Sequence, residues 1–347
     1  MHQNKIYIGS NLLHIFKVLK DRKNNIPSIL VESNMEIGGA WKVHTIKDRI
    51  ITEMGGHILY KDRFTFYKLK LIYNVSIKLL KPQPQVKLGD SYVADDKLSV
   101  YMNNKNDDNI ILSLIKVIKY LFERLFKGSH FYFESGVIPF LTDARHALDQ
   151  VIVHGSATQI SKLNRGYRVY LADGNFLDAD NVEISRGSLL KKIVGMEPKY
   201  DSIKSRNVFF VTDGRLNING FVSFGIPTYA QLGKKSEKSN VSDAIRLVRL
   251  SELSAYSSGL LANENVYCVS ILCSDATWAD EGLYERIFLL LVQEKFAKTS
   301  DAAKILFVDK VDYTLNRMQE ESISALKRSG VIINDVTDMA NAIRKYL

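Results

Sequence analysis

The sequence predicts an α/β fold, and three features of its N-terminal part support this prediction. A short strand, KIYIG at 5–9, is followed by apolar residues at helical spacing across 11–22. A second buried strand, ILVE at 29–32, ends in an acid. Two glycine pairs then follow, Gly38–Gly39 and Gly55–Gly56. The strand–helix–strand order has the tight spacing of a parallel sheet.

Composition allows two domains and shows no membrane-spanning run. The chain has 347 residues, 46% of them hydrophobic, which is ample for a large core. No apolar run reaches membrane-spanning length, and the N-terminus opens directly into a strand instead of a signal peptide, so we expect a cytoplasmic protein. Cys268 and Cys273 lack the second pair that a metal site would need, so we expect reduced thiols and no bound metal.

The net charge of +9 indicates an anionic partner. The basic residues do not form one block and no nucleic-acid-binding motif is present, so we do not expect a nucleic acid. A nucleotide, a nucleotide sugar or an acidic membrane surface would each fit. The amphipathic basic stretch at 111–128 allows peripheral membrane contact, although an ordinary helix packed by its Leu, Ile and Phe face is favoured.

The rest of the chain alternates helical and strand-like patterns without an internal repeat. The predicted segments are a loop and helix over 131–150, a meander of strands over 151–185, strands within 207–227 and 244–272, a helix over 280–298, a strand over 306–316 and a helix from 337 to the end.

The most informative residues are the acid and the glycines near the N-terminus. An acid at the end of a strand, here Glu32, can bind both ribose hydroxyls of an adenine dinucleotide. Paired glycines allow the backbone to approach a flat cofactor where a Cβ would collide. Trp41, after the first pair, either covers the adenine or fills the core, and we favour the core.

These N-terminal elements resemble the FAD-binding entry of the flavin amine oxidase and UDP-galactopyranose mutase superfamily. Two later regions resemble it as well, in the same order: GVIPFLTDARHALD with the strands that follow it, and the C-terminal VIINDVTDMANAIRKYL. The resemblance implies an FAD-type two-dinucleotide-binding (Rossmann-like) domain and a second domain of helices and mixed or antiparallel sheet. We expect the first domain to comprise 1–60, 128–205 and 315–347, and the second, a substrate or cap domain, to comprise 61–127 and 206–314.

The resemblance also implies a set of FAD-binding residues. His57 matches a histidine beside the flavin ring and is the catalytic candidate, although bonding to local backbone is the alternative. Asp338–Met339 matches the pair that opens the C-terminal helix, whose N-terminus suits the electron-rich end of the ring. The expected cofactor contacts are Gly9, Ser10, Asn11, Glu32, Ser33, Gly38, Gly39, Ala40, Trp41, Gly55, Gly56, Asp338 and Met339.

The phosphate loop departs from the family pattern. The three glycine positions of G-x-G-x-x-G are Gly9, Asn11 and His14 in this chain. Asn11 tolerates a left-handed backbone, but its side chain intrudes where the pyrophosphate should approach. His14 stands where helix and strand need a small residue, and it either contacts a phosphate or packs. The helix is therefore displaced outward, or the site does not hold a dinucleotide in the usual way.

A substrate contact is predicted further along the chain. The run VRLSE resembles the Thr-Arg-x-x-Glu segment of the mutases, in which the arginine meets the diphosphate of a nucleotide sugar. Arg249 is the candidate, because a guanidinium pairs with phosphate oxygens in two places. Arg246 is its rival, and a plain surface arginine is the alternative. Strand alternation predicts that Arg249 shares a face with Leu247 and Ser251 and lies opposite Arg246.

Two functions follow from these patterns. The first is a flavin-dependent oxidoreductase or mutase-like enzyme that acts on a nucleotide sugar or related anionic metabolite, with surface polysaccharide biosynthesis as a candidate role. The alternative is a descendant of the same fold that has lost FAD and works as a binding or assembly protein. The altered loop favours the alternative, whereas Glu32 and the glycine pairs favour the enzyme.

Overall fold

The computed structural model describes residues 2–39, 43–46, 50–53, 59–61, 77–79, 85–88, 91–94, 129–133, 137–218, 220–224, 245–255 and 265–334. The chain divides into two compact units. The first comprises Met1–Lys42, Val137–Ile203 and Thr314–Leu347, and the second comprises Val43–Gly136 and Lys204–Tyr313. Two of the boundaries fall within long strands, β15 (Tyr200–Thr212) and β19 (Ile305–Met318).

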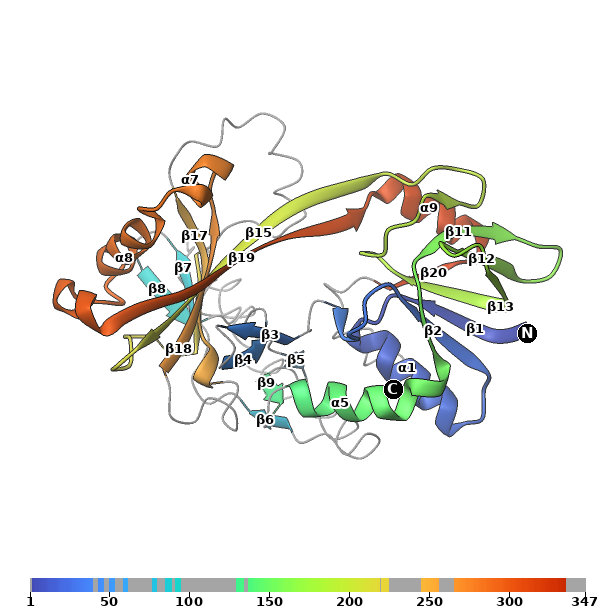
Figure 1. Cartoon of the computed structure of the whole chain (residues 1–347), viewed down its shortest axis with the longest axis horizontal. Helices are drawn as coiled ribbons and strands as arrows, with labels where there is room; N and C mark the ends of the chain where they lie inside the picture. The colour runs from blue at the N-terminus through green and yellow to red at the C-terminus, as the bar shows by residue number, and fades with distance from the viewer. Residues whose placement is uncertain are drawn as a thin grey trace, which may run out of the picture. The chain divides into compact units, whose positions relative to one another are not determined.

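The first unit is built around the predicted strand–helix–strand element. Strand β1 (His2–Ile8) leads into helix α1 (Leu12–Lys23), and β2 (Ser28–Glu32) returns parallel to β1 (Figure 1). In the register, Ile6 is opposite Ile29 and Ile8 is opposite Val31. Both strands are rich in β-branched residues and buried, as the strands of a parallel sheet are. The predicted βαβ unit is therefore confirmed.

The sheet of this unit extends on both sides of β1 and β2. Its order in the described residues is β10-β2-β1-β13-β12-β11-β14, and β20 also pairs with β13. Strands β1 and β20 run parallel to β13, whereas β11, β12 and β13 form an antiparallel meander. The bounds are β10 (Ile152–His154), β11 (Ala157–Lys162), β12 (Tyr167–Leu171), β13 (Phe176–Ser185), β14 (Lys192–Ile193) and β20 (Ile332–Asn334).

Helices complete the first unit. Helix α1 packs against β2 and against α5 (Val137–Leu148), and the rings of Phe16 and Phe140 lie 5.1 Å apart. A short 3-10 turn, η2 (Asp149–Val151), leads from α5 into β10. Helix α9 (Glu320–Ser329) precedes β20 and ends at Gly330, whose φ of 92° suits a left-handed C-cap.

The second unit has a sheet with the order β19-β15-β18-β17-β16-β7-β8 in the described residues. The β16–β7 pair is parallel, and the β15–β18, β18–β17, β17–β16 and β7–β8 pairs are antiparallel. Its strands, besides β15 and β19, are β7 (Gln85–Leu88), β8 (Ser91–Ala94), β16 (Phe221–Ser223), β17 (Arg246–Glu252) and β18 (Asn265–Leu272). Two small sheets accompany it, made of β3 (Val43–Ile46) and β4 (Ile50–Glu53), and of β5 (Leu59–Lys61), β9 (Ser129–Phe133) and β6 (Ile77–Leu79).

Helix α8 (Leu283–Gln293) covers one face of the large sheet. Its buried residues Leu283, Ile287 and Leu291 recur at helical spacing and share a core with Leu250 and Val269. The short helix α7 (Asp275–Ala279) precedes it, and the 3-10 turns η3 (Leu253–Ala255) and η4 (Thr299–Lys304) connect strands. The helix predicted for 280–298 is thus shorter than expected.

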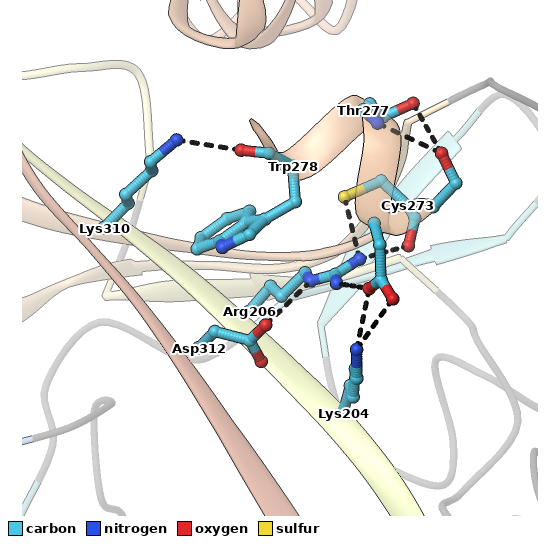
Figure 2. Close-up of polar contacts among 9 residues, drawn as sticks. Lys204, Arg206, Cys273, Thr277, Trp278, Lys310 and Asp312 are labelled. Atoms are coloured by element: carbon cyan, nitrogen blue, oxygen red, sulfur yellow. Dashed lines mark hydrogen bonds and ion pairs between the residues drawn. The ribbon is translucent and has the colours of Figure 1, made fainter. Parts of the chain in front are cut away.

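A buried arginine ties α7 to the sheet of the second unit. Arg206 of β15 is 3% exposed, and its guanidinium donates to the carbonyl of Cys273 at 2.5 Å and pairs with Asp275 (Figure 2). The same group lies 5.4 Å from the ring centroid of Trp278 and 3.4 Å from Asp312 of β19. One side chain therefore joins β15, α7 and β19 within this unit.

Three of the predicted segments need comment. The FYF run at 131–133, predicted as a loop, belongs to strand β9, because it pairs with β5 and β6. The helices predicted at 111–128 and from residue 337 onward lie outside the described residues. In the part of the chain that the structure describes, no helix is both long and apolar enough to cross a membrane, and no cluster of His, Cys, Asp or Glu could hold a metal ion.

Candidate functional site

The turn that follows β1 is the centre of the candidate site. Gly9 has a φ of 83°, a left-handed conformation, and a Cβ at this position would lie 2.5 Å from Ser188 Oγ and 3.1 Å from Ser185 Cβ. Its N–H donates to the carbonyl of Val31 at 2.8 Å, which holds the turn against β2. Both the backbone angle and the space therefore require glycine here.

Glu32 ends β2 beside this turn and is only 4% exposed. Its Oε2 accepts hydrogen bonds from the backbone N–H of Ser10 at 2.8 Å and from the Ser10 hydroxyl at 2.5 Å. Its Oε1 accepts from the backbone N–H of Asn34 at 2.9 Å and from the Asn34 side-chain amide at 2.8 Å. Ser33 Oγ lies 3.3 Å from the same oxygen. A carboxylate has about four lone-pair sites, so these donors saturate Glu32.

These hydrogen bonds also decide the charge of Glu32. Burial alone would raise its pKa, but the donors from Ser10 and Asn34 outweigh burial and hold the pKa below its usual range. Glu32 is therefore an ionised carboxylate inside the first unit.

The first glycine pair packs against the same turn. The N–H of Gly38 lies 3.0 Å from both the carbonyl and the hydroxyl oxygen of Ser10. Gly38 and Gly39 have φ values of 117° and 58°, and a Cβ on Gly39 would lie 3.5 Å from Asn11 Cα. The backbone of the glycine pair therefore packs against the turn at Ser10 and Asn11.

Asn11 caps helix α1. It has an extended backbone (φ −64°, ψ 161°), so the left-handed conformation that it tolerates is not used. Its Oδ1 accepts a hydrogen bond from the backbone N–H of His14 at 2.9 Å. This is the ordinary geometry of an N-cap, and it satisfies one of the free N–H groups at the helix start.

His14, at the third glycine position, is completely buried and belongs to a polar network. Its Nδ1 lies 2.5 Å from the carbonyl of Gly9, and its Nε2 lies 2.8 Å from the side-chain amide of Asn334. That amide nitrogen also donates to Glu183 Oε2 at 2.7 Å, and Lys17 pairs with the same oxygen. A carbonyl can only accept, so Nδ1 carries the proton and Nε2 accepts from the amide.

Burial lowers the pKa of His14 to about 4, although the nearby Glu183 acts in the opposite direction. Burial likewise lowers the pKa of Lys17, with Glu183 opposing it. His14 is therefore neutral at physiological pH, and both of its nitrogens have partners within the protein. A packing and bonding role accounts for this residue in the described structure.

The structure brings part of the predicted site together. Around the turn lie Gly9, Ser10, Asn11, Glu32, Ser33, Gly38 and Gly39. Outside the described residues lie Ala40, Trp41, Gly55, Gly56, His57, Asp338 and Met339. Sequence reasoning missed Asn34, although an amide two residues after a strand-end acid is a usable local signal. It also missed Glu183 and Asn334, which have no local signal.

An adenine dinucleotide fits this site in part. Glu32 stands at the carboxyl end of β2, beside the turn after β1, as ribose binding requires. Its lone pairs, however, are already occupied, and the N-terminus of α1 is capped by Asn11. FAD therefore fits the backbone and the acid of the site but not its hydrogen bonds as they stand.

The predicted substrate residue lies in the second unit, and its orientation corrects the prediction. In β17, the register with β18 shifts between Leu247, opposite Ile271, and Arg249, opposite Ser270. Val248 is the additional residue of this β-bulge, so alternation breaks there. The prediction that Arg249 shares a face with Leu247 and lies opposite Arg246 is wrong. Both arginines lie on the face opposite to Leu247. Of the prediction, only the part that Arg249 shares a face with Ser251 is correct.

Arg249 belongs to a row of polar residues across four strands. Asn207 of β15 is opposite Ser270 of β18, Ser270 is opposite Arg249, and Arg249 is opposite Ser223 of β16. Directly opposite residues share a face, so the row lies on one side of the sheet. Ser270 Oγ donates to Asn207 Oδ1 at 2.7 Å, and the Arg249 guanidinium lies 5.8 Å from the ring centroid of Phe221.

The row next to it on this face is apolar except for one serine, and consists of Phe209, Cys268, Ser251 and Phe221. Burial raises the pKa of the Cys268 thiol to about 12, while the nearby Arg249 acts to lower it. Cys268 is therefore a neutral, buried thiol beside the guanidinium.

Comparison with solved structures identifies the architecture. Reduced UDP-galactopyranose mutase is similar with a TM-score of 0.62 and 11% identity, covering 96% of this chain and 88% of that one. Wild-type putrescine oxidase bound to putrescine is similar with a TM-score of 0.59 and 11% identity, covering 100% and 97%. An oxidoreductase from Methanosarcina mazei has a TM-score of 0.55 and 11% identity, covering 90% and 88%.

No protein-family model matches the chain, and its sequence has no match among curated proteins. These structures nevertheless confirm the fold that the resemblance drawn from the sequence implies. The chain therefore has an α/β fold, with a Rossmann-like domain and a second mixed domain, that is similar to the fold of these structures.

Proposed function

We propose that the protein is a flavin-dependent oxidoreductase or mutase-like enzyme that acts on a nucleotide sugar or a related anionic metabolite. The observation that carries the flavin assignment is the placement of Glu32, an ionised acid at the carboxyl end of β2 beside the turn after β1. In this architecture that position binds the ribose of an adenine dinucleotide. The fold similarity to a mutase and to an oxidase supports the same reading.

The chain's own residues would bind FAD at its adenosine end. Glu32 would accept from the ribose, and Gly9 and the Gly38–Gly39 pair would keep the backbone close. When bound, FAD would supply a hydride carrier or a nucleophilic nitrogen. The roles of His57 and of Asp338–Met339 beside the ring are proposals that rest on the sequence resemblance.

The substrate assignment rests on Arg249 and its surroundings. A guanidinium in a row with Ser223, Ser270 and Asn207 combines a phosphate-binding group with neighbouring hydroxyl and amide groups. The net charge of +9 also favours an anionic ligand. A nucleotide-sugar substrate would suit surface polysaccharide biosynthesis in the cytoplasm.

One observation favours a second candidate, a binding or assembly protein that has lost FAD. Both oxygens of Glu32 are satisfied within the chain, and Asn11 caps the helix that would receive the pyrophosphate. A closed loop of this kind needs no cofactor to satisfy its polar groups.

The test is whether the purified protein is yellow and binds FAD. We expect a flavin spectrum, or FAD binding in a titration followed by flavin fluorescence. Glu32→Ala should weaken that binding by about 1–3 kcal/mol, because hydrogen bonds to a charged group are lost. Glu32→Gln, which keeps the shape, guards against misfolding. Glu36→Ala serves as control, since this exposed acid pairs with Arg145 instead. A colourless protein with no FAD affinity favours the second candidate, and equal affinity in all variants removes Glu32 from the site.

A further inference from the structure

Two side chains around the turn after β1 supply the same kinds of hydrogen-bonding groups that a bound nucleotide would supply. A ribose offers hydroxyl donors to the acid at the end of the second strand, and a pyrophosphate offers acceptor oxygens to N–H groups at the helix start. In this chain Asn34 supplies the donor to Glu32, through its side-chain amide at 2.8 Å. Asn11 supplies the acceptor to an N–H of α1, through its Oδ1 at 2.9 Å.

Ser10 and Asn34, which each donate twice to Glu32, differ in how easily a ligand can replace them. Ser10 is buried, and its N–H and hydroxyl bind Oε2 from within the loop. Asn34 is exposed, on a bend after β2, and both its backbone N–H and its side-chain amide donate to Oε1. A ligand hydroxyl would therefore compete with the Asn34 amide for Oε1, while the Ser10 contacts stay in place.

At the helix start the competitor is a single side chain as well. The cap of Asn11 occupies the N–H of His14, in the loop position that carries the second glycine in the family pattern. Glycine in that position would leave the N–H free for a phosphate oxygen. Glycine is also an acceptable N-cap, so Asn11→Gly should leave helix α1 folded.

We propose that this loop is self-liganded: Asn34 and Asn11 occupy the hydrogen-bonding positions of the ribose and the pyrophosphate, so FAD binds by competing with the chain's own side chains. The inference rests on the proposed function, because it concerns the same site, and it makes FAD an exchangeable ligand. Asn34 and Asn11 are then the residues that set the affinity, and Glu32 provides the shared acceptor.

The experiment titrates FAD into the full chain and follows flavin fluorescence, with no requirement for activity. The variants are Asn34→Ala, Asn11→Gly and the double variant. Asn164→Ala is the matched control, an exposed asparagine in the turn between β11 and β12. Urea unfolding without FAD checks that each variant is folded. Each single change should tighten the FAD dissociation constant about tenfold, since it removes one hydrogen bond that the ligand must otherwise displace. The control should leave it unchanged.

The outcomes separate this inference from the proposed function. Weak binding by the wild type and tighter binding by the variants support both. Binding by the variants alone supports the self-liganded loop and removes FAD as the ligand of the natural protein. Tight binding by the wild type that the variants leave equal or weaken overturns the inference and leaves the flavin assignment standing. No binding by any folded variant overturns both.

Discussion

The imidazole of His14 accepts a hydrogen bond from the side-chain amide of Asn334, with 2.8 Å between Nε2 and Nδ2. This contact joins helix α1 to strand β20, and the same amide continues to Glu183 of β13. The third position of a dinucleotide-binding loop needs a small residue so that helix and strand can pack closely. Here a histidine occupies it because the network supplies a partner for each of its nitrogens.

Protonation of His14 should destabilise the protein. Burial lowers its pKa to about 4, below the ordinary 6.5, so the unfolded chain takes up the proton first as the pH falls. The stability from neutral His14 is fully present above pH 6.5 and is lost between 6.5 and about 4. The free energy of unfolding falls by about 3 kcal/mol over that interval.

Urea unfolding of wild type and His14→Gln across this pH range measures the effect as a difference between the two curves. The groups that face His14 are Glu183, Lys17 and Glu32, with Asn334 and the Tyr7 ring. All of these groups are present in both proteins, so their contributions to the difference largely cancel. Parallel curves for the two proteins would contradict a neutral buried His14.

Alanine at Gly9 should cost more than alanine at a glycine with the same backbone but open surroundings. Gly174 provides the comparison, since its φ is 89° and nothing lies within 4 Å of its Cβ position. Gly174→Ala should therefore cost about 1 kcal/mol, from the left-handed backbone alone. Gly9→Ala adds the clash with Ser188 and Ser185 and should cost about 2–4 kcal/mol. Thermal unfolding compares them, and equal losses would mean that the loop relaxes freely.

Arg206 should contribute much more to stability than Lys204, although both bind Asp275. The Arg206 fork also bonds to the Cys273 carbonyl and is buried, whereas Lys204 is exposed. Arg206→Lys keeps the charge but loses the fork, so we expect a loss of about 2 kcal/mol. Lys204→Ala should cost less than about 1 kcal/mol, as exposed ion pairs do. The midpoints of urea unfolding compare the two variants. A similar loss of stability in both would assign the stability to Asp275 itself.

Arg249 should bind a diphosphate through two parallel contacts. Arg249→Lys should weaken binding of UDP or a UDP-sugar about tenfold, because an ammonium cannot form the paired contact. Arg246→Lys is the matched control, on the same strand and face but exposed. Calorimetric titration measures both. A larger loss in the Arg246 variant would move the contact to that residue, and no binding by the wild type would remove the nucleotide-sugar assignment.

Local sequence signals predicted the parts of the fold and site that depend on neighbours in sequence. The βαβ unit follows from two apolar strands and a helical period, and Glu32 follows from its place at the end of β2. The hydrogen bonds of His14 and Asn334 join residues 320 positions apart, so no local pattern reveals them. The strand at 131–133 was missed for a related reason, since its pairing with β5 and β6 decides its conformation.

The Val248 bulge changes how β17 should be aligned with other chains. Strand β17 contains one residue more than the β18 segment that it faces, and the N–H of Phe224 holds this additional residue through the Val248 carbonyl at 3.0 Å. A chain with a regular strand here would carry its two face-sharing positions two residues apart, as Arg-x-Arg, instead of the Arg-x-x-Arg of this protein. An alignment without a one-residue gap at 248 will therefore exchange the positions of the two faces on one half of the strand.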